Sequence, residues 1–207
     1  MATKMLQRYN ERERLNHWMV VLLFALAALS GLAFFHPSLY FLSNLLGGGV
    51  WARILHPFLG VAVALSFLGL FLRLWKDNAV TAQDKLWAEH MGDMMRGDKS
   101  AMPPVGKYNY GQKMVFWITA SSLLVLMLTG LVFWSPWFAP YFGIALQRVA
   151  VLLHSVAAVA LVVGIIVHVY AAIWVKGTMR AMTRGTVTES WAKANHPLWH
   201  QEMHKRS

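Results

Sequence analysis

Two histidines interrupt an apolar stretch, Val149 to Val175, that contains no Asp, Glu, Lys or Arg. His154 and His168 lie fourteen residues apart in it. At about 100° and 1.5 Å per residue, a helix would project both rings from nearly the same face, about 21 Å apart along its axis. Because a bilayer core is about 30 Å thick, one ring would then lie near each membrane surface. Polar rings in hydrocarbon need partners and usually mark a functional site.

The composition places these rings in a membrane. Hydrophobic residues make up 57% of the 207-residue chain and charged residues only 14%, with a mean hydropathy of +0.44. The net charge of +10 would also suit a nucleic-acid-binding protein. All lysines and arginines except Arg53 and Arg148, however, fall on one side of the predicted spans. By the positive-inside rule both termini are cytoplasmic, and the expected partner is membrane lipid and not nucleic acid.

The predicted fold class is all-α, a four-transmembrane-helix bundle with short cytoplasmic surface helices. It forms a single integral-membrane domain over residues 1–207. The surface helices are expected from Asp84 to Arg96, along an apolar stripe, and over 189–195, where Thr188 would cap the helix start. The first span is interpreted as retained, because no small-residue cleavage site follows it. The four spans are predicted at about 17–35, 51–75, 114–134 and 149–175.

The third span contains no histidine and no charged residue, so we assign it to packing. Its small residues, which include Thr129 and Gly130, allow close approach between helices. The loops on the outer side are apolar and rich in aromatic residues. They indicate an interfacial aromatic belt or a docking surface for another subunit.

Four histidines sort into two pairs by their depth in the predicted spans. His56 and His154 each lie about five residues from the outer end of a span, roughly 8 Å below the surface. His17 and His168 lie towards the inner end of theirs. The sequence therefore predicts an outer pair and an inner pair. His36, at the outer end of the first span, is interpreted as a boundary residue.

A histidine pair of this kind favours haem over other metal groups. Neutral imidazole binds iron, zinc and copper. Zinc usually takes a third or fourth protein ligand, and no Cys, Asp or Glu lies at either depth. Axial ligation of haem needs only two histidines and leaves no open position for oxygen. We therefore predict two haem groups that pass single electrons. The alternative, packing histidines bonded to carbonyls, does not explain the depth-matched pairs.

Charged residues near the spans refine this interpretation. Arg53 and Arg148 closely precede the two outer histidines and could pair with haem propionates. No Asp or Glu occurs between Glu13 and Asp77, or between positions 98 and 189. A carboxylate relay across the bilayer is therefore absent, which disfavours a pump or a proton-coupled transporter.

Other histidines lie outside the spans. His90 is interpreted as solvated. His196, His200 and His204 follow one another at i, i+4, a spacing that resembles a metal-binding face. Because they lie in a basic tail, we do not assign them a metal.

Five segments resemble the cytochrome b (gamma) subunit of respiratory membrane-bound formate dehydrogenases, over nearly the whole chain. The tail segment WAKANHPLWHQE is also similar, but the family more often has a basic residue and a tyrosine at the positions of Leu198 and His200. The five segments are LNHW around His17, ARILHPFLG around His56, VGKYNYGQK before the third span, LLHSVAAVAL around His154 and HVYAAIWVKGT from His168.

The resemblance implies that His56 and His154 bind the outer haem b, and that His17 and His168 bind the inner one. It implies electron flow from a periplasmic molybdenum or tungsten (alpha) subunit, through an iron–sulfur (beta) subunit, to the outer haem, the inner haem and then menaquinone or ubiquinone. Quinone reduction would take protons from the cytoplasm. The location implied is the bacterial inner membrane. The alpha, beta and gamma subunits would form a heterotrimer, and several heterotrimers could assemble into a larger oligomer.

The resemblance also places Asn109 and Gly111 at the border of a quinone site, with His168 close by. A plain turn at the start of a helix is the alternative for Asn109 and Gly111. For the whole chain, two alternatives remain: the cytochrome b subunit of a nickel–iron hydrogenase or related oxidoreductase, and a haem-free membrane anchor.

Overall fold

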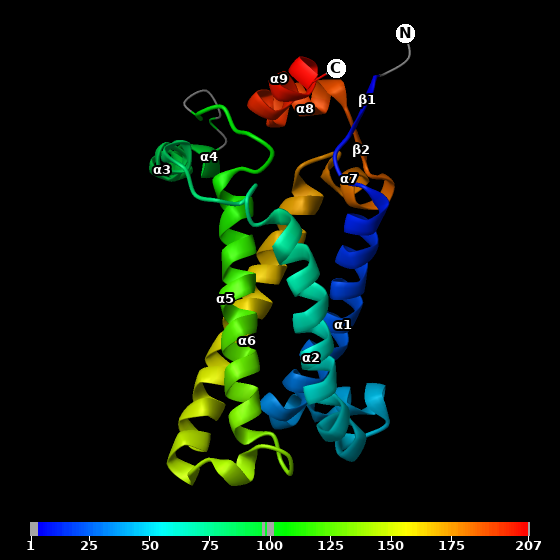
Figure 1. Cartoon of the computed structure of the whole chain (residues 1–207), viewed down its shortest axis with the longest axis vertical. Helices are drawn as coiled ribbons and strands as arrows, with labels where there is room; N and C mark the ends of the chain where they lie inside the picture. The colour runs from blue at the N-terminus through cyan, green and yellow to red at the C-terminus, as the bar shows by residue number, and fades with distance from the viewer. Residues whose placement is uncertain (1–3, 97, 99–101, 207) are drawn as a thin grey trace. The chain divides into compact units, whose positions relative to one another are not determined.

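The computed structural model describes residues 4–96, 98 and 102–206, and its elements are labelled in Figure 1. Four helices are long and apolar enough to cross a bilayer: α1 (Glu11–Phe35), α2 (Gly49–Leu74), α5 (Tyr110–Phe133) and α6 (Ile144–Trp174). The predicted all-α class and its four long apolar helices are thereby confirmed. Each helix begins before the predicted span, and in α1 and α5 the side chains of Asn10 and Asn109 cap the earlier start.

Shorter elements connect and follow the long helices. The described residues form two 3₁₀ helices, η1 (Pro37–Leu46) and η2 (Ala139–Tyr141), and two short strands, β1 (Met5–Gln7) and β2 (Thr186–Thr188). In place of one helix over 84–96 there are two, because His90 ends the first of them. The remaining helices are α3 (Ala82–Glu89), α4 (Met91–Met95), α7 (Thr178–Arg184), α8 (Glu189–Asn195) and α9 (Pro197–Arg206).

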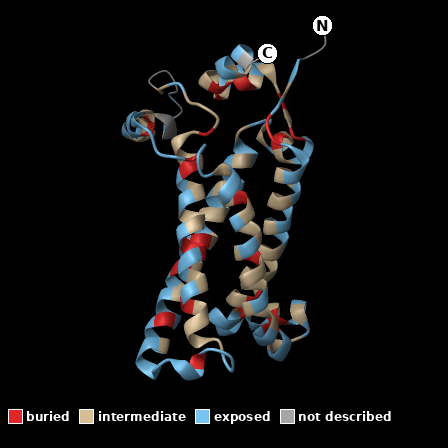
Figure 2. Ribbon diagram, in the orientation of Figure 1, coloured by how far each residue is buried: buried red, intermediate tan, exposed pale blue. Residues whose placement is uncertain are grey.

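Many large apolar residues of the long helices are exposed, and Figure 2 colours much of these helices as exposed. On α6, Leu152 is 65% exposed and Ile166 is 62% exposed. A soluble protein rarely leaves such a continuous apolar surface in contact with water. Lipid is the solvent that this surface requires, in agreement with the membrane predicted from composition.

The contacts within the chain form two compact units. The bundle unit comprises Leu15–Leu72 and Ile118–Val167, and the terminal unit comprises the described residues of Met1–Arg14, Arg73–Trp117 and His168–Ser207. In the bundle unit, Val63 of α2, Leu123 of α5 and Leu161 of α6 form a buried cluster, and Phe24 of α1 packs against it. All four long helices therefore contribute to one core.

The terminal unit has a small core of its own around a two-stranded antiparallel ribbon. Leu6 of β1 pairs with Val187 of β2, and Val187 is only 1% exposed. The ribbon's other side-chain contacts include Trp199 of α9 and Ala192 of α8, which belong to the same buried cluster. The capping of α8 by Thr188 is as predicted, since its hydroxyl accepts a hydrogen bond from Trp191 N.

A buried arginine fills the centre of the terminal unit. Arg8 lies over the rings of Trp199, at 4.9 Å, and Tyr108, at 5.8 Å. Its Nη2 lies 3.3 Å from His196 Nε2, and His196 Nδ1 lies 2.8 Å from Gly106 O. Burial and the neighbouring guanidinium lower the pKa of His196 to about 4, so this ring is neutral at pH 7.

Candidate functional site

His56 of α2 and His154 of α6 face each other in the bundle unit. Their ring centroids are 6.4 Å apart, and the ring planes meet at 66°. A bond from imidazole nitrogen to a metal is about 2.0–2.1 Å long, so two imidazoles on opposite sides of one metal have centroids about 6 Å apart. The observed separation therefore fits one iron between the two rings.

Ser30 of α1 fixes the tautomer of His56. The Ser30 hydroxyl lies 2.8 Å from His56 Nδ1 and donates its own hydrogen to Ala27 O, also at 2.8 Å. With its hydrogen used in this way, the hydroxyl oxygen accepts from His56 Nδ1–H. The proton is therefore on Nδ1, and the Nε2 lone pair remains for a metal. Metal-binding histidines generally have their second nitrogen fixed in this way.

Thr129 of α5 plays the same part for His154. Its Oγ1 lies 3.0 Å from His154 Nδ1 and donates to Val125 O at 2.6 Å. The hydroxyl therefore accepts from His154 Nδ1–H, which again leaves Nε2 as the ligand atom. Hydroxyls from α1 and α5 thus hold both outer histidines in the same tautomer, with Nε2 of each ring available.

Two glycines make room for these rings. A Cβ on Gly31 of α1 would lie 3.2 Å from His56 Cε1, and one on Gly130 of α5 would lie 3.4 Å from His154 Cε1. Each glycine directly follows the residue that holds the ring. Sequence reasoning assigned Thr129 and Gly130 to packing and did not consider Ser30 or Gly31. The available signal was a hydroxyl–glycine pair, Ser-Gly or Thr-Gly, on each of the two helices.

The predicted inner pair has one member in each unit, His17 in the bundle unit and His168 in the terminal unit. It stays a prediction. The helix turn before His17 is anchored by Asn16, whose Nδ2 donates to Ser66 O at 2.8 Å and lies 3.0 Å from Ser66 Oγ. A Cβ on Gly69 would approach Asn16 Oδ1 to 2.8 Å, so this close contact between α1 and α2 requires glycine.

Asn109 and Gly111 lie at the start of α5. The Asn109 side chain accepts from Gln112 N at 2.9 Å, and the Gln112 side chain accepts from Asn109 N at 3.0 Å. This reciprocal pair is a capping box, which satisfies two backbone donors at the helix start. The helix-start role weighed for Asn109 is therefore present, and a quinone role would be additional to it.

Arg53 and Arg148 are both exposed on the helices that carry the outer histidines. Arg53 precedes His56 by three residues on α2, a spacing that puts both on one side of a helix. Arg148 precedes His154 by six residues on α6, which places it about 120° around the helix from His154. His36, at the outer end of α1, caps η1 by accepting from Ser38 N at 3.2 Å.

Comparison with known proteins decides the family. The sequence profile of a family described as prokaryotic cytochrome b561 matches residues 8–185. The cytochrome b556(fdo) subunit of formate dehydrogenase from Escherichia coli strain K12 is 46% identical over 198 residues, covering 96% of this chain and 93% of that protein. The chain belongs to the cytochrome b subunits of formate dehydrogenase.

Two further relatives agree with this assignment of the cytochrome b subunit. The nitrate-inducible cytochrome b556(Fdn) subunit of Escherichia coli strain K12 is 39% identical, over 98% of this chain and 94% of that protein. The formate dehydrogenase cytochrome b556 subunit of Haemophilus influenzae is 40% identical, over 94% of this chain and 82% of that protein. The resemblance noted in the sequence is thereby confirmed.

Membership in this family has three direct implications. A cytochrome b subunit carries haem b, which the paired His56 and His154 suit. A formate dehydrogenase subunit acts with the other subunits of that complex. The four long apolar helices make this chain a membrane subunit of a bacterial enzyme.

Proposed function

We propose that this cytochrome b subunit carries electrons across the bacterial inner membrane on two haem b groups and delivers them to menaquinone or ubiquinone. Electrons enter at the outer end of the bundle, from an iron–sulfur subunit that serves a molybdenum or tungsten formate-oxidising subunit. Protons for quinone reduction come from the cytoplasm. Each haem, when bound, supplies a one-electron redox centre.

The observation that carries this proposal is the geometry of His56 and His154. Their centroid separation of 6.4 Å fits one iron, and each ring is held with Nε2 as the available nitrogen. A haem-free anchor does not need two facing histidines whose Nδ1 atoms are each held by a hydroxyl from another helix. The outer pair therefore favours a redox role over the anchor considered from the sequence.

For the inner haem we propose His17 and His168 as ligands, on the grounds of their depth in the spans and of the family resemblance. Asn109 and Gly111 would border the quinone site, with His168 nearby. In this role Asn109 keeps its capping box, and its location at the start of α5 gives the site a rigid edge.

Of the two proposed propionate contacts, Arg53 is the better placed, since it lies on the same side of α2 as His56. A guanidinium can hold a propionate carboxylate through two parallel hydrogen bonds. Arg148 would reach the outer haem only from another side of α6. If replacing both arginines left the outer haem's content and potential unchanged, neither would contact a propionate.

A redox titration of the reduced b-type α-band in the purified complex tests the ligand assignment. The wild type should titrate as two components. His56→Ala and His154→Ala should each remove the same component, and His17→Ala should remove the other. His168→Ala should remove that other component together with quinone reduction. A His168 variant that retained both components and full turnover would disprove the inner pairing.

The partner subunits distinguish the remaining alternative. A cytochrome b subunit of a nickel–iron hydrogenase has the same helical bundle, but it would co-purify with a hydrogenase. We expect this chain to co-purify with a formate-oxidising subunit and an iron–sulfur subunit. Absence of any b-type α-band in the purified complex would favour the haem-free anchor.

A further inference from the structure

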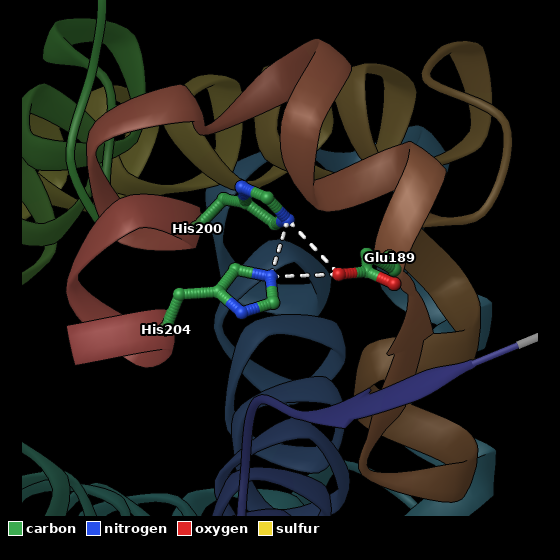
Figure 3. A group of neighbouring side chains, drawn as sticks. All are labelled: Glu189, His200 and His204. Atoms are coloured by element: carbon green, nitrogen blue, oxygen red, sulfur yellow. Dashed lines mark hydrogen bonds and ion pairs between the residues drawn. The ribbon is translucent and has the colours of Figure 1, made fainter. Parts of the chain in front are cut away.

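Three donor atoms from the C-terminal helices converge on one point outside the haem site. Glu189 Oε1 lies 2.7 Å from His204 Nε2 and 3.3 Å from His200 Nε2, and the two Nε2 atoms are 3.1 Å apart. Figure 3 shows both rings turned toward the carboxylate, His200 and His204 from α9 and Glu189 from the start of α8. The sequence pattern suggested His196 as the third member, but His196 faces Gly106 and Arg8 instead.

These separations match those of ligands around a small cation. With bonds of about 2.0–2.2 Å, donor atoms lie about 2.9 Å apart at a right angle and about 3.3 Å apart at the tetrahedral angle. Two of the three separations, 3.1 and 3.3 Å, lie in this range, and the 2.7 Å between Glu189 Oε1 and His204 Nε2 is slightly shorter. Without a cation, two neutral rings that donate to one oxygen bring their N–H dipoles side by side at the 3.1 Å contact. If a cation binds between them, the carboxylate oxygen and the two Nε2 atoms each direct a lone pair to it, and the repulsion between the N–H groups is removed.

The two helices that carry the three side chains hold them close to one another. His200 and His204 are four residues apart, so they lie on one face of α9, and their ring centroids are 4.5 Å apart. The buried Trp199 of α9 and Ala192 of α8 belong to one cluster, which packs α9 against α8. Glu189 is the first residue of α8, directly after its cap Thr188. The cluster is thus assembled on two helices that pack against each other.

We propose that Glu189, His200 and His204 bind a divalent first-row transition cation such as Zn²⁺. Two imidazoles, one carboxylate and one water make up a common four-coordinate set for zinc, and these nitrogen and oxygen donors suit Zn²⁺ better than Ca²⁺ or Mg²⁺. The His204 side chain is 41% exposed, which leaves the fourth position open to water. This site is independent of the proposed haem and quinone function.

Lys4 competes with the cation. Its ammonium lies 3.6 Å from Glu189 Oε1, the same oxygen that faces both rings. A bound cation replaces this exposed ion pair with three stronger bonds and joins the start of α8 to α9. Metal binding would therefore reduce the opening of α9, and removal of Lys4 would strengthen binding. Neither effect is expected if the cluster is held together by hydrogen bonds alone.

Zinc itself is the probe for this proposal. The complete chain, purified with its complex and stripped by a chelator, is titrated with Zn²⁺ against a competing indicator, and the bound metal is counted by mass spectrometry. We expect one high-affinity equivalent. His200→Gln and His204→Gln should each weaken it at least tenfold, whereas the matched control His90→Gln, in the same unit but outside the cluster, should leave it unchanged.

Two further measurements exclude indirect effects. Amide exchange in α9 of the zinc-free protein should be the same in wild type and the two glutamine variants, and added Zn²⁺ should slow it only in the wild type and His90→Gln. Lys4→Met should tighten zinc binding several-fold. Absence of a stoichiometric equivalent, an equivalent that survives His200→Gln, or no tightening by Lys4→Met would each overturn the proposal.

Discussion

Ser30 accepts a hydrogen bond from Nδ1 of His56, at 2.8 Å, while its own hydrogen is used by Ala27 O. This contact joins α1 to α2 and leaves Nε2 of His56 as the nitrogen available to the proposed haem iron. Thr129 repeats it for His154 at 3.0 Å. The outer pair is therefore specified by four helices, of which only two carry the histidines.

Removing this hydroxyl should change the outer haem alone. In Ser30→Ala, His56 loses its hydrogen-bond acceptor and becomes a weaker electron donor to the iron. We expect the midpoint potential of the outer haem to rise, by about 59 mV for every tenfold loss of preference for ferric iron. Redox titration measures this shift. Ser155→Ala is the matched control, because that serine donates only to Val151 O of its own helix; an equal shift there would refute the role of Ser30.

Adding a methyl group beside the rings should impair haem incorporation in a graded way. Gly31→Ala brings a Cβ to 3.2 Å from His56, and Gly130→Ala brings one to 3.4 Å from His154. Because the first contact is tighter, Gly31→Ala should lose more of the outer haem, as quantified by the α-band per unit of protein. Gly60→Ala, which meets nothing within 4 Å, should retain full haem content. Equal loss in all three variants would point to a general folding defect.

The contact between Gly69 and Asn16 provides the corresponding test at the other end of α1. A Cβ on Gly69 would lie 2.8 Å from Asn16 Oδ1, so Gly69→Ala forces Asn16 to move and shifts the turn that carries His17. We expect the component assigned to the inner haem to decrease while the outer component persists. Selective loss of the outer component instead would contradict the assignment of His17.

A buried ion pair holds α3 against α5, and breaking it should loosen α3. Lys113 Nζ lies 2.7 Å from Asp84 Oδ2, and both side chains are less than a tenth exposed. Lys113→Met leaves a buried carboxylate without its cation, at a cost of about 3–5 kcal/mol. Amide exchange in α3 should accelerate accordingly. The double variant with Asp84→Asn should recover most of the lost stability, because no buried charge then remains. The control Asp77→Asn breaks an exposed pair with Lys107 and should lower the stability by less than about 1 kcal/mol.

The same carboxylate predicts how the stability of α3 depends on pH. Burial alone would raise the pKa of Asp84, but hydrogen bonds from Lys113 and Thr81 outweigh this effect and lower it. Because this pKa is lower in the folded state, the folded state binds fewer protons than the unfolded chain. The stabilisation that Asp84 provides is therefore complete above its ordinary pKa of 3.8, and it is lost as the pH falls through the lower pKa of the folded state. Exchange in α3, corrected for intrinsic rates, should show this loss in wild type and not in the Asp84→Asn variant.

Much of the architecture follows from the sequence because it depends on local properties. Apolar runs long enough to cross a bilayer gave the four helices, and residue counts along them placed His56 and His154 at the same depth. The partners Ser30 and Thr129 could not be found by counting, since a hydroxyl in an apolar helix usually bonds its own backbone. Which ring lies beside it depends on how neighbouring helices are rotated, and this is a property of tertiary packing.

The tail shows the opposite limit of sequence reasoning. The i, i+4 spacing marked three histidines as equivalent, yet His196 lies on the buried side and is replaced in the cluster by Glu189, eleven residues before His200. The strand pairing of β1 with β2 was likewise not predicted. Both features join segments far apart in the chain, for which three-residue strands and single carboxylates give no local signal.

The pairing of β1 with β2 also sets an order of events during synthesis. β1 leaves the ribosome first, but its partner β2 follows α6, the last of the four long helices. Arg8 likewise waits for His196 and Trp199 before its surroundings are complete. The ribbon can therefore close only after every long helix has been made. A closed ribbon thus identifies a chain whose translation has passed the last long helix, and a chain interrupted earlier leaves β1 without its partner strand.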